Sequence, residues 1–200
     1  MKLRHLTILA ATGALSLASC GENAQSSSSS PTQTVAGAAP APAAANFNTA
    51  DVQFAQSMIP HHQQAVEMAD IALDPTVGAG AQVHDLATRI KGAQDPEIAM
   101  MSVWLTSWGQ PMQMDTSMSQ GMHMTDGMMT DAEMAGLHNV KGAEFDTMWM
   151  QMMIRHHTGA IAMGQTVKAS GTNADAVALA DQVITAQQSE IDEMKAILGT

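Results

Sequence analysis

Two pairs of adjacent histidines stand in matching contexts, MIPHH at residues 58–62 and MIRHH at residues 153–157. In each context one methionine lies three residues before the first histidine and four before the second, and another methionine follows the pair. Imidazole nitrogen and thioether sulfur are both copper ligands, and thioethers select Cu(I) over harder ions. The spacing therefore predicts copper ligands, and the candidates of this motif are Met58, His61, His62, Met68, Met153, His156, His157 and Met163.

Neighbouring residues of a helix point about 100° apart, so one histidine of each pair faces a partner helix. We expect His61 and His156 to face the core, and His62 and His157 to stand at its flank. The alternative is a pair of core histidines that form hydrogen bonds and bind no metal.

The histidine motifs belong to an internal repeat. The segment FAQSMIPHHQQAVEMA at 54–69 corresponds to WMQMMIRHHTGAIAMG at 149–164, and LATRIKGAQDPEIAMM at 86–101 corresponds to LADQVITAQQSEIDEM at 179–194. Shared apolar residues recur every three and four positions, which is the period of a helix. Each unit holds two such segments around a short turn that contains glycine. The sequence therefore predicts an all-α fold, an antiparallel four-helix bundle of two αα-hairpins over 48–109 and 131–200.

Helix rise places further polar residues beside the histidines. In the first hairpin, His61 and Gln94 each lie roughly 18–20 Å from the turn at a rise of 1.5 Å per residue, so they share a layer. Gln187 stands in the same relation to the second histidine pair. Burial of unpaired polar groups costs about 1–3 kcal/mol each, so hydrogen bonds or a metal must satisfy them. The next layer adds the candidates Glu97, Met101, Glu190 and Met194.

The connector between the hairpins, residues 110–130, is rich in methionine and contains no leucine, isoleucine, valine or aromatic residue. We expect this segment to stay out of the core and to bind Cu(I) through soft thioethers. The alternative is an adhesive apolar surface. Thr130 and Glu133 predict a capping box that begins a short helix. The connector candidates are Met112, Met114, Met118, Met122, His123, Met124, Met128 and Met129.

The N-terminal residues predict export. Residues 1–19 combine a basic start with a short apolar stretch, as in a signal peptide. LASC at 17–20 resembles a lipobox, so we expect Cys20 to be lipidated and to anchor the protein to a membrane. The Ser-, Ala- and Pro-rich residues 20–47 predict a flexible tether. Gly21 favours the outer membrane of a Gram-negative envelope. The alternative is a plain secretory signal.

Composition excludes several classes of function. A net charge of −11 over 200 residues argues against nucleic-acid binding. One cysteine excludes a disulfide framework and a four-cysteine zinc site. A di-iron centre normally uses Glu-x-x-His motifs, which this sequence lacks. No motif of an enzyme is present, so we expect no catalytic activity.

The repeated pattern MI-x-HH-x-x-A-x-x-M, followed by A-x-x-Q-x-x-E-I-x-x-M, resembles the bacterial domain of unknown function 305 family over about residues 50–198. The resemblance implies a ferritin-like bundle. It also implies that the motif positions are the methionines and histidines of the first pattern and the glutamine, glutamate and final methionine of the second. The family includes exported copper-binding proteins implicated in copper resistance.

The sequence thus predicts an exported, lipid-anchored protein that sequesters Cu(I) or Cu(II) or hands it on, in copper tolerance or homeostasis. Its expected partners are metal ions, the membrane through the lipid anchor, and copper-export or copper-chaperone proteins. The alternatives are a tethered helical interaction module that binds no metal, and a di-iron protein.

Overall fold

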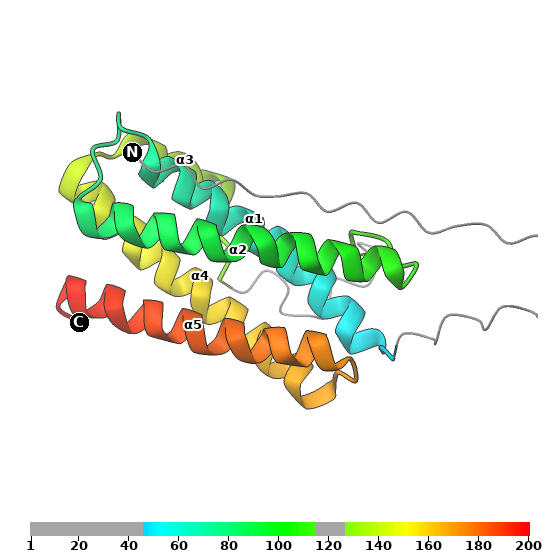
Figure 1. Ribbon diagram of the computed structural model, residues 1–200. Coiled ribbons are helices and arrows are strands. Elements are labelled where there is room, and N and C mark those ends of the chain that lie inside the picture. Colours follow the sequence, from blue (N-terminus) through cyan, green and yellow to red (C-terminus); the bar gives the residue numbers. More distant parts are fainter. Residues whose placement is uncertain (1–45, 115–126) are drawn as a thin grey trace, which may run out of the picture. The chain divides into compact units, whose positions relative to one another are not determined.

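The computed structural model describes residues 46–114 and 127–200 of the chain (Figure 1). The predicted signal peptide, Cys20 and nearly all of the predicted tether lie outside these residues. The described part is helical and contains no strand, so the all-α prediction is confirmed. None of its helices is long and apolar enough to cross a membrane. The helices are α1 (Thr49–Leu73), α2 (Ala81–Ser107), α3 (Asp131–Asn139), α4 (Gly142–Ser170) and α5 (Ala174–Leu198).

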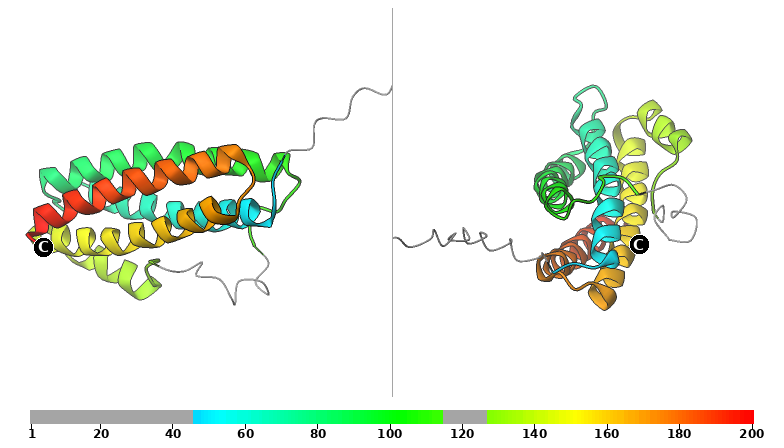
Figure 2. Two further views of the ribbon diagram at one scale, coloured as in Figure 1. Left: turned by 90° about the horizontal axis from the view of Figure 1, so that it is seen from below. Right: turned by 90° about the vertical axis from the view of Figure 1, so that its right-hand side faces the viewer.

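Four of the helices form the predicted bundle. Helices α1 and α2 pack against each other as one hairpin, α4 and α5 form the other, and α1 lies against α4 to join the two. Viewed from two further sides, α2 and α5 lie on one side of the α1–α4 pair (Figure 2). The short helix α3 packs on α4, on the opposite side. We call the contact between α1 and α4 the central seam.

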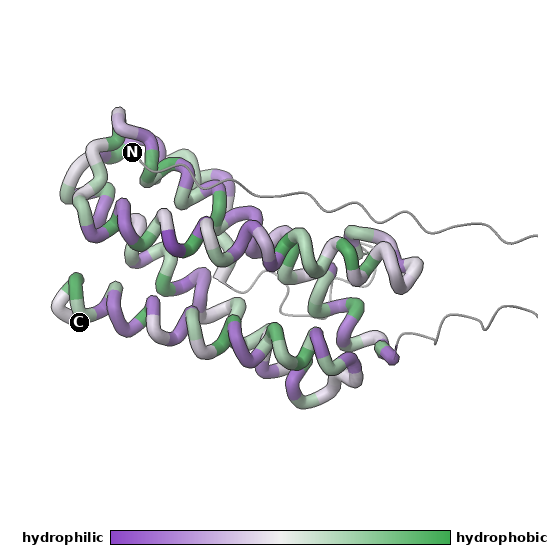
Figure 3. The backbone as a smooth tube through the Cα atoms, in the orientation of Figure 1, coloured by the Kyte–Doolittle hydropathy of each residue, from purple (hydrophilic) through white to green (hydrophobic). Residues whose placement is uncertain are grey.

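Apolar side chains form two clusters along the bundle, and the histidines lie between them. Cluster 1 takes residues 65–72 of α1, 83–90 of α2 and 145–153 of α4. Cluster 2 takes residues 54–59 of α1, 101–105 of α2, 160–167 of α4 and 176–183 of α5. Helices α1 and α4 therefore pass the clusters in opposite order, as antiparallel helices must. Apolar and polar residues alternate along each helix in the tube view (Figure 3), as one-sided burial requires.

Capping boxes begin two of the helices. Thr130 accepts a hydrogen bond from the backbone N–H of Glu133, and the Glu133 carboxylate accepts one from the Thr130 backbone. This confirms the capping box that the sequence predicts for α3. Asn48 and Asp51 form the second box at the start of α1.

Two aspartates join the hairpins at opposite ends of the bundle. Asp51 is fully buried, and its Oδ2 accepts the backbone N–H groups of Thr172 at 3.0 Å and Asn173 at 3.1 Å, in the turn between α4 and α5. In the other hairpin, Asp146 accepts the backbone N–H of Gly80, in the turn between α1 and α2, at 3.0 Å. These two aspartates are 95 residues apart, which is the displacement of the repeat. Both lie just upstream of the segments in which the repeat is visible, so the sequence pattern did not indicate them.

Candidate metal centre

The first histidines of the two pairs meet at the central seam. The rings of His61 on α1 and His156 on α4 have centroids 3.7 Å apart and planes inclined by 37°. Both side chains are fully buried. The antiparallel crossing of α1 and α4 brings together residues that are 95 positions apart in the sequence. The prediction that these two histidines face the core is correct.

The second histidines are also fully buried, so the expectation that they stand at the flank is wrong. The Nε2 atom of His62 lies 2.7 Å from Oε2 of Glu97 on α2, and Nε2 of His157 lies 2.7 Å from Oε2 of Glu190 on α5. Two neighbouring faces of α1 and of α4 are covered, one by the seam and one by the hairpin partner. The periodicity of a single helix does not show that the hairpin partner covers a second face.

Two glutamines complete a polar layer across the bundle. Gln94 on α2 and Gln187 on α5 are 2% and 3% exposed, as the register predicts. Within the described residues, both amide atoms of Gln94, Oε1 of Gln187 and the Nδ1 atoms of His62 and His157 have no hydrogen-bond partner. Buried polar groups are nearly always paired, so these atoms are available to an ion or a water. We use the name polar layer for His61, His62, Gln94, Glu97, His156, His157, Gln187 and Glu190.

Burial favours the neutral form of two histidines of this layer, His156 and His157. Desolvation lowers the pKa of His156 well below its usual value, and the nearby His61 and His157 lower it further. Desolvation also lowers the pKa of His157, although the hydrogen bond with Glu190 opposes the shift. A neutral imidazole has a free nitrogen lone pair, which is the form that binds a metal. Protons therefore compete weakly for these nitrogens near neutral pH.

Methionine sulfurs lie in both apolar clusters on either side of the polar layer. Met58 and Met101 belong to cluster 2, and their counterparts Met153 and Met194 belong to cluster 1. All four are fully buried. The repeat thus places equivalent thioethers on opposite sides of the histidines. The two remaining bundle candidates are Met68, which is fully buried in cluster 1, and Met163, which is partly buried against cluster 2.

The connector differs from the prediction at its C-terminal end. Met129 is only 5% exposed and belongs to cluster 1, so the expectation that the connector stays out of the core is wrong there. Met112 is 44% exposed, while Met114 and Met128 are half-buried. The other four candidates, Met118, Met122, His123 and Met124, lie outside the described residues.

Met129 is buried because side chains of the seam hold it. Gln64 on α1 forms two hydrogen bonds with the Met129 backbone, and Arg155 on α4 donates to the Met129 sulfur. Neither Gln64 nor Arg155 was among the predicted site residues. The sequence did contain a sign of their role. The two halves of the repeat agree around these positions but differ at them, with Gln64 opposite Gly159 and Pro60 opposite Arg155.

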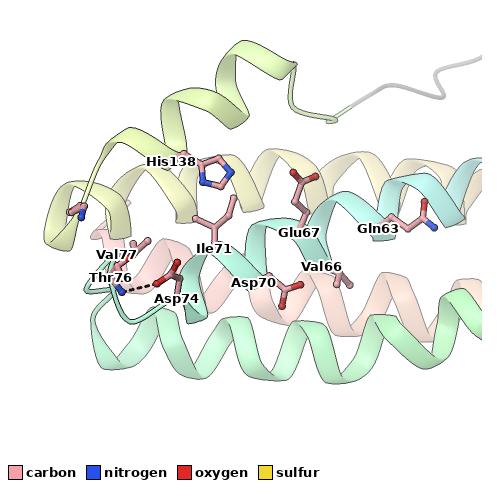
Figure 4. Close-up of a pocket in the computed structure, with 10 residues that line it drawn as sticks. Gln63, Val66, Glu67, Asp70, Ile71, Asp74, Thr76, Val77 and His138 are labelled. Carbon is pink, nitrogen blue, oxygen red and sulfur yellow. Dashed lines mark hydrogen bonds between the residues drawn. The ribbon is translucent and has the colours of Figure 1, made fainter.

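The described residues place no three His, Cys, Asp or Glu side chains around one metal position. A surface pocket of about 580 Å³ beside α1 and α3 contains carboxylates and a histidine but is not such a metal position (Figure 4). Glu67, Asp70 and His138 line it, and each is solvent-exposed. The carboxylate of Asp70 pairs with Lys91 across the hairpin. The polar layer is therefore the stronger candidate, with imidazole and thioether donors that suit a soft ion.

A family model described as a domain of unknown function, DUF305, matches residues 51–198. The chain belongs to the DUF305 family. A DUF305 protein from Streptomyces coelicolor is 34% identical, with a TM-score of 0.69, over 75% of this chain and 92% of that one. A DUF305 fragment from Deinococcus radiodurans is 31% identical, with a TM-score of 0.65, over 76% of this chain and 97% of that one.

Copper-bound structures are among the proteins similar to this DUF305 chain. CopM in its Cu(I)-bound form is 28% identical, with a TM-score of 0.60, over 73% of this chain and 93% of that one. CopM structures in Cu(II)-bound and Ag-bound forms match as well. No protein of curated function matches the sequence. The DUF305 fold of this chain is therefore related to that of a copper-binding protein.

Proposed function

We propose that this DUF305 protein binds copper ions through histidine and methionine side chains and sequesters them or hands them on, without catalysing a reaction. The observation that carries the proposal is the polar layer, in which four fully buried histidines lie between clusters that contain buried thioethers. The unpartnered Nδ1 atoms of His62 and His157 and amide oxygens of Gln94 and Gln187 offer lone pairs that only a ligand or water would satisfy.

The chemistry of the donors supports copper. Imidazole suits several metals, including copper, whereas thioether sulfur narrows the choice to soft ions such as Cu(I). The ligands proposed in the bundle are His61 and His156, with Met58 and Met153 as adjacent soft donors. The exposed Met112 and its neighbours in the connector are a second proposed set, and net negative charge of the chain attracts cations toward both.

The proposed place of action is the cell envelope. The apolar N-terminal stretch and the LASC sequence support export and lipidation at Cys20. Copper handling there fits a role in copper tolerance, with copper-export or copper-chaperone proteins as partners. The outer membrane is the proposed location in a Gram-negative host.

Anaerobic titration with Cu(I) against a chromogenic chelator tests the proposal. The chain carries Cys20→Ser, so that no thiol competes for copper. We expect the protein to withdraw Cu(I) from the chelator. If it withdraws none, the copper proposal fails, and the alternative of a tethered interaction module becomes the better account.

Two matched variants locate the ions. Replacement of His61 and His156 by glutamine removes the central imidazoles and keeps polar groups in the layer. Replacement of Met112, Met114 and Met128 by leucine removes thioethers and keeps apolar volume. Loss of bound copper in the first variant alone assigns it to the bundle, and loss in the second alone assigns it to the connector.

A further inference from the structure

The C-terminal end of the connector, residues 127–129, docks on the central seam at the level of the histidine pair. A Cβ atom on Gly127 would lie 2.6 Å from the carbonyl oxygen of Arg155 and 3.1 Å from that of His156. The φ angle of Gly127 is +82°, in the left-handed region that favours glycine. Space and backbone conformation both require glycine at this contact.

Side chains from both helices of the seam hold the docked segment. Gln64 Nε2 donates to the carbonyl oxygen of Met129 at 2.9 Å, and Gln64 Oε1 accepts from its N–H at 2.7 Å. Arg155 Nη2 donates to the Met129 sulfur at 2.7 Å. Gln64 follows His61 by three residues, so the two share a face of α1. The segment therefore lies across α1 and α4 beside the histidine pair.

The two hairpins differ where this segment docks. The counterpart of Gln64 is Gly159, whose Cα would lie 3.2 Å from a Cβ on Gly127. The counterpart of Pro60 is Arg155. One hairpin thus supplies the hydrogen-bonding amide, and the other supplies the space and the guanidinium. Both hairpins keep the MI-x-HH motif. The differences at these positions involve residues that contact the docked segment, and the histidines are the same.

We propose that residues 127–129 close the outer side of the polar layer, and that soft monovalent ions such as Cu(I) enter and leave the His61–His156 pair there. Gln64 and Gly127 are positioning residues that set how often this entrance opens. The proposal rests on the proposed function, because it assumes that the histidines bind copper. It adds the route of the ion and the residues that control it.

The energetics favour this route. All four histidines are fully buried, so an ion needs an opening. Opening the entrance breaks the two Gln64 hydrogen bonds and the Arg155 contact and withdraws one buried side chain, Met129, from cluster 1. Separating the helices would instead expose both apolar clusters. Local openings with few apolar contacts cost least. Met128 and Met129 lie at this entrance, and their thioethers favour soft ions.

A competing route runs along the hairpin faces. Glu97 and Glu190 have side chains 19% and 13% exposed, and they contact the second histidines. An ion that entered there would meet a hard carboxylate first and would reach His62 or His157 before the central pair.

Histidine acylation by diethyl pyrocarbonate tests the cover without any metal. The variant is Gln64→Leu, and the matched control is Gln63→Leu at the adjacent, exposed position. Loss of two hydrogen bonds should speed acylation of His61 and His156 roughly tenfold. The exposed His84 and His138 serve as internal references in the same sample and should react at unchanged rates.

Gly127→Ala provides a second variant on a loop, where the helices do not depend on the substituted residue. Its methyl group displaces the segment from the seam, so it should also speed acylation of the central pair. Equal acylation rates in the control and in both variants would overturn the proposal. Circular dichroism confirms that each variant keeps its helices.

Copper exchange tests the route itself. Release of Cu(I) to excess chelator should be roughly tenfold faster in Gln64→Leu, with equilibrium affinity nearly unchanged. A rate that changes in Glu97→Gln and not in Gln64→Leu would place the route at the hairpin face and refute the entrance. If no variant binds copper, the proposed function fails, and acylation still decides whether residues 127–129 cover the pair.

Discussion

The two hairpins place the same residues in the polar layer but differ at their edges. Each supplies two buried histidines, a glutamine and a glutamate, and each inserts an aspartate toward the turn of the other hairpin. The first hairpin alone clamps the connector with a glutamine, and the second alone offers it a glycine. The repeat therefore builds a symmetric centre, while single differences between the hairpins fit one side of it to the connector.

The aspartate contacts give the largest expected contrast between the hairpins. Asp51→Ala leaves the backbone N–H groups of Thr172 and Asn173 without their acceptor and removes a capping box. We expect a loss of about 3 kcal/mol in the free energy of unfolding. Asp146→Ala removes one backbone acceptor and should cost about 1 kcal/mol. Urea denaturation of both variants measures the contrast, and equal losses would refute it.

A pH series examines the histidines of the second hairpin. Because burial lowers the pKa of His156 and His157, the unfolded chain gains protons below about pH 6.5 while the folded chain does not. Stability is therefore present above pH 6.5 and is lost as pH falls toward the folded pKa values. Each histidine contributes a slope of up to about 1.4 kcal/mol per pH unit.

Urea midpoints of the metal-free protein at pH 7.5 and pH 5.5 measure this loss. The variant His157→Gln should lose less stability over the same range, because one of the titrating groups is gone. A midpoint that does not change between the two pH values would contradict the expected burial cost.

The two glutamines should respond unequally when their amides are removed. Gln94→Met keeps the shape of the side chain and eliminates two buried amide atoms that lack partners within the described residues. We expect the metal-free protein to gain about 1–2 kcal/mol of stability. Gln187→Met eliminates one such atom and should gain about half as much. Thermal unfolding of the metal-free variants checks the order, and a loss of stability in Gln94→Met would show that the amide is satisfied.

The smallest effect is expected at the edge of the connector. The Arg155 guanidinium pairs with Glu133 at 2.5 Å, but the two side chains are 49% and 37% exposed, so water screens the pair. The hydrogen bond from the Thr130 backbone lowers the pKa of Glu133 most, the hydrogen bond from Arg155 lowers it next, and the pKa falls to about 2. Arg155→Ala should therefore change the unfolding free energy by less than about 1 kcal/mol. A larger loss in chemical denaturation would mean that the contact with Met129 stabilises the whole bundle.

Periodicity and repeat were sufficient to predict the bundle and the central histidines. His61 and Gln94 fall in one layer because helix rise is constant, so distance from a turn is readable from the sequence. The burial of His62 depends on α2 covering a second face of α1, which no single helix encodes. The burial of Met129 depends on Gln64, which lies 65 positions away in the chain. Such pairings arise from tertiary contact, and local patterns do not contain them.

Asp51 also determines how the molecule bears mechanical load. Just before α1, Asn46 and Asn48 hydrogen-bond the backbone of Thr172 and Ser170, next to the residues that Asp51 holds. A force that pulls on the chain ahead of residue 46 is therefore passed at once to the turn between α4 and α5. The two hairpins then share that force at this end of the bundle.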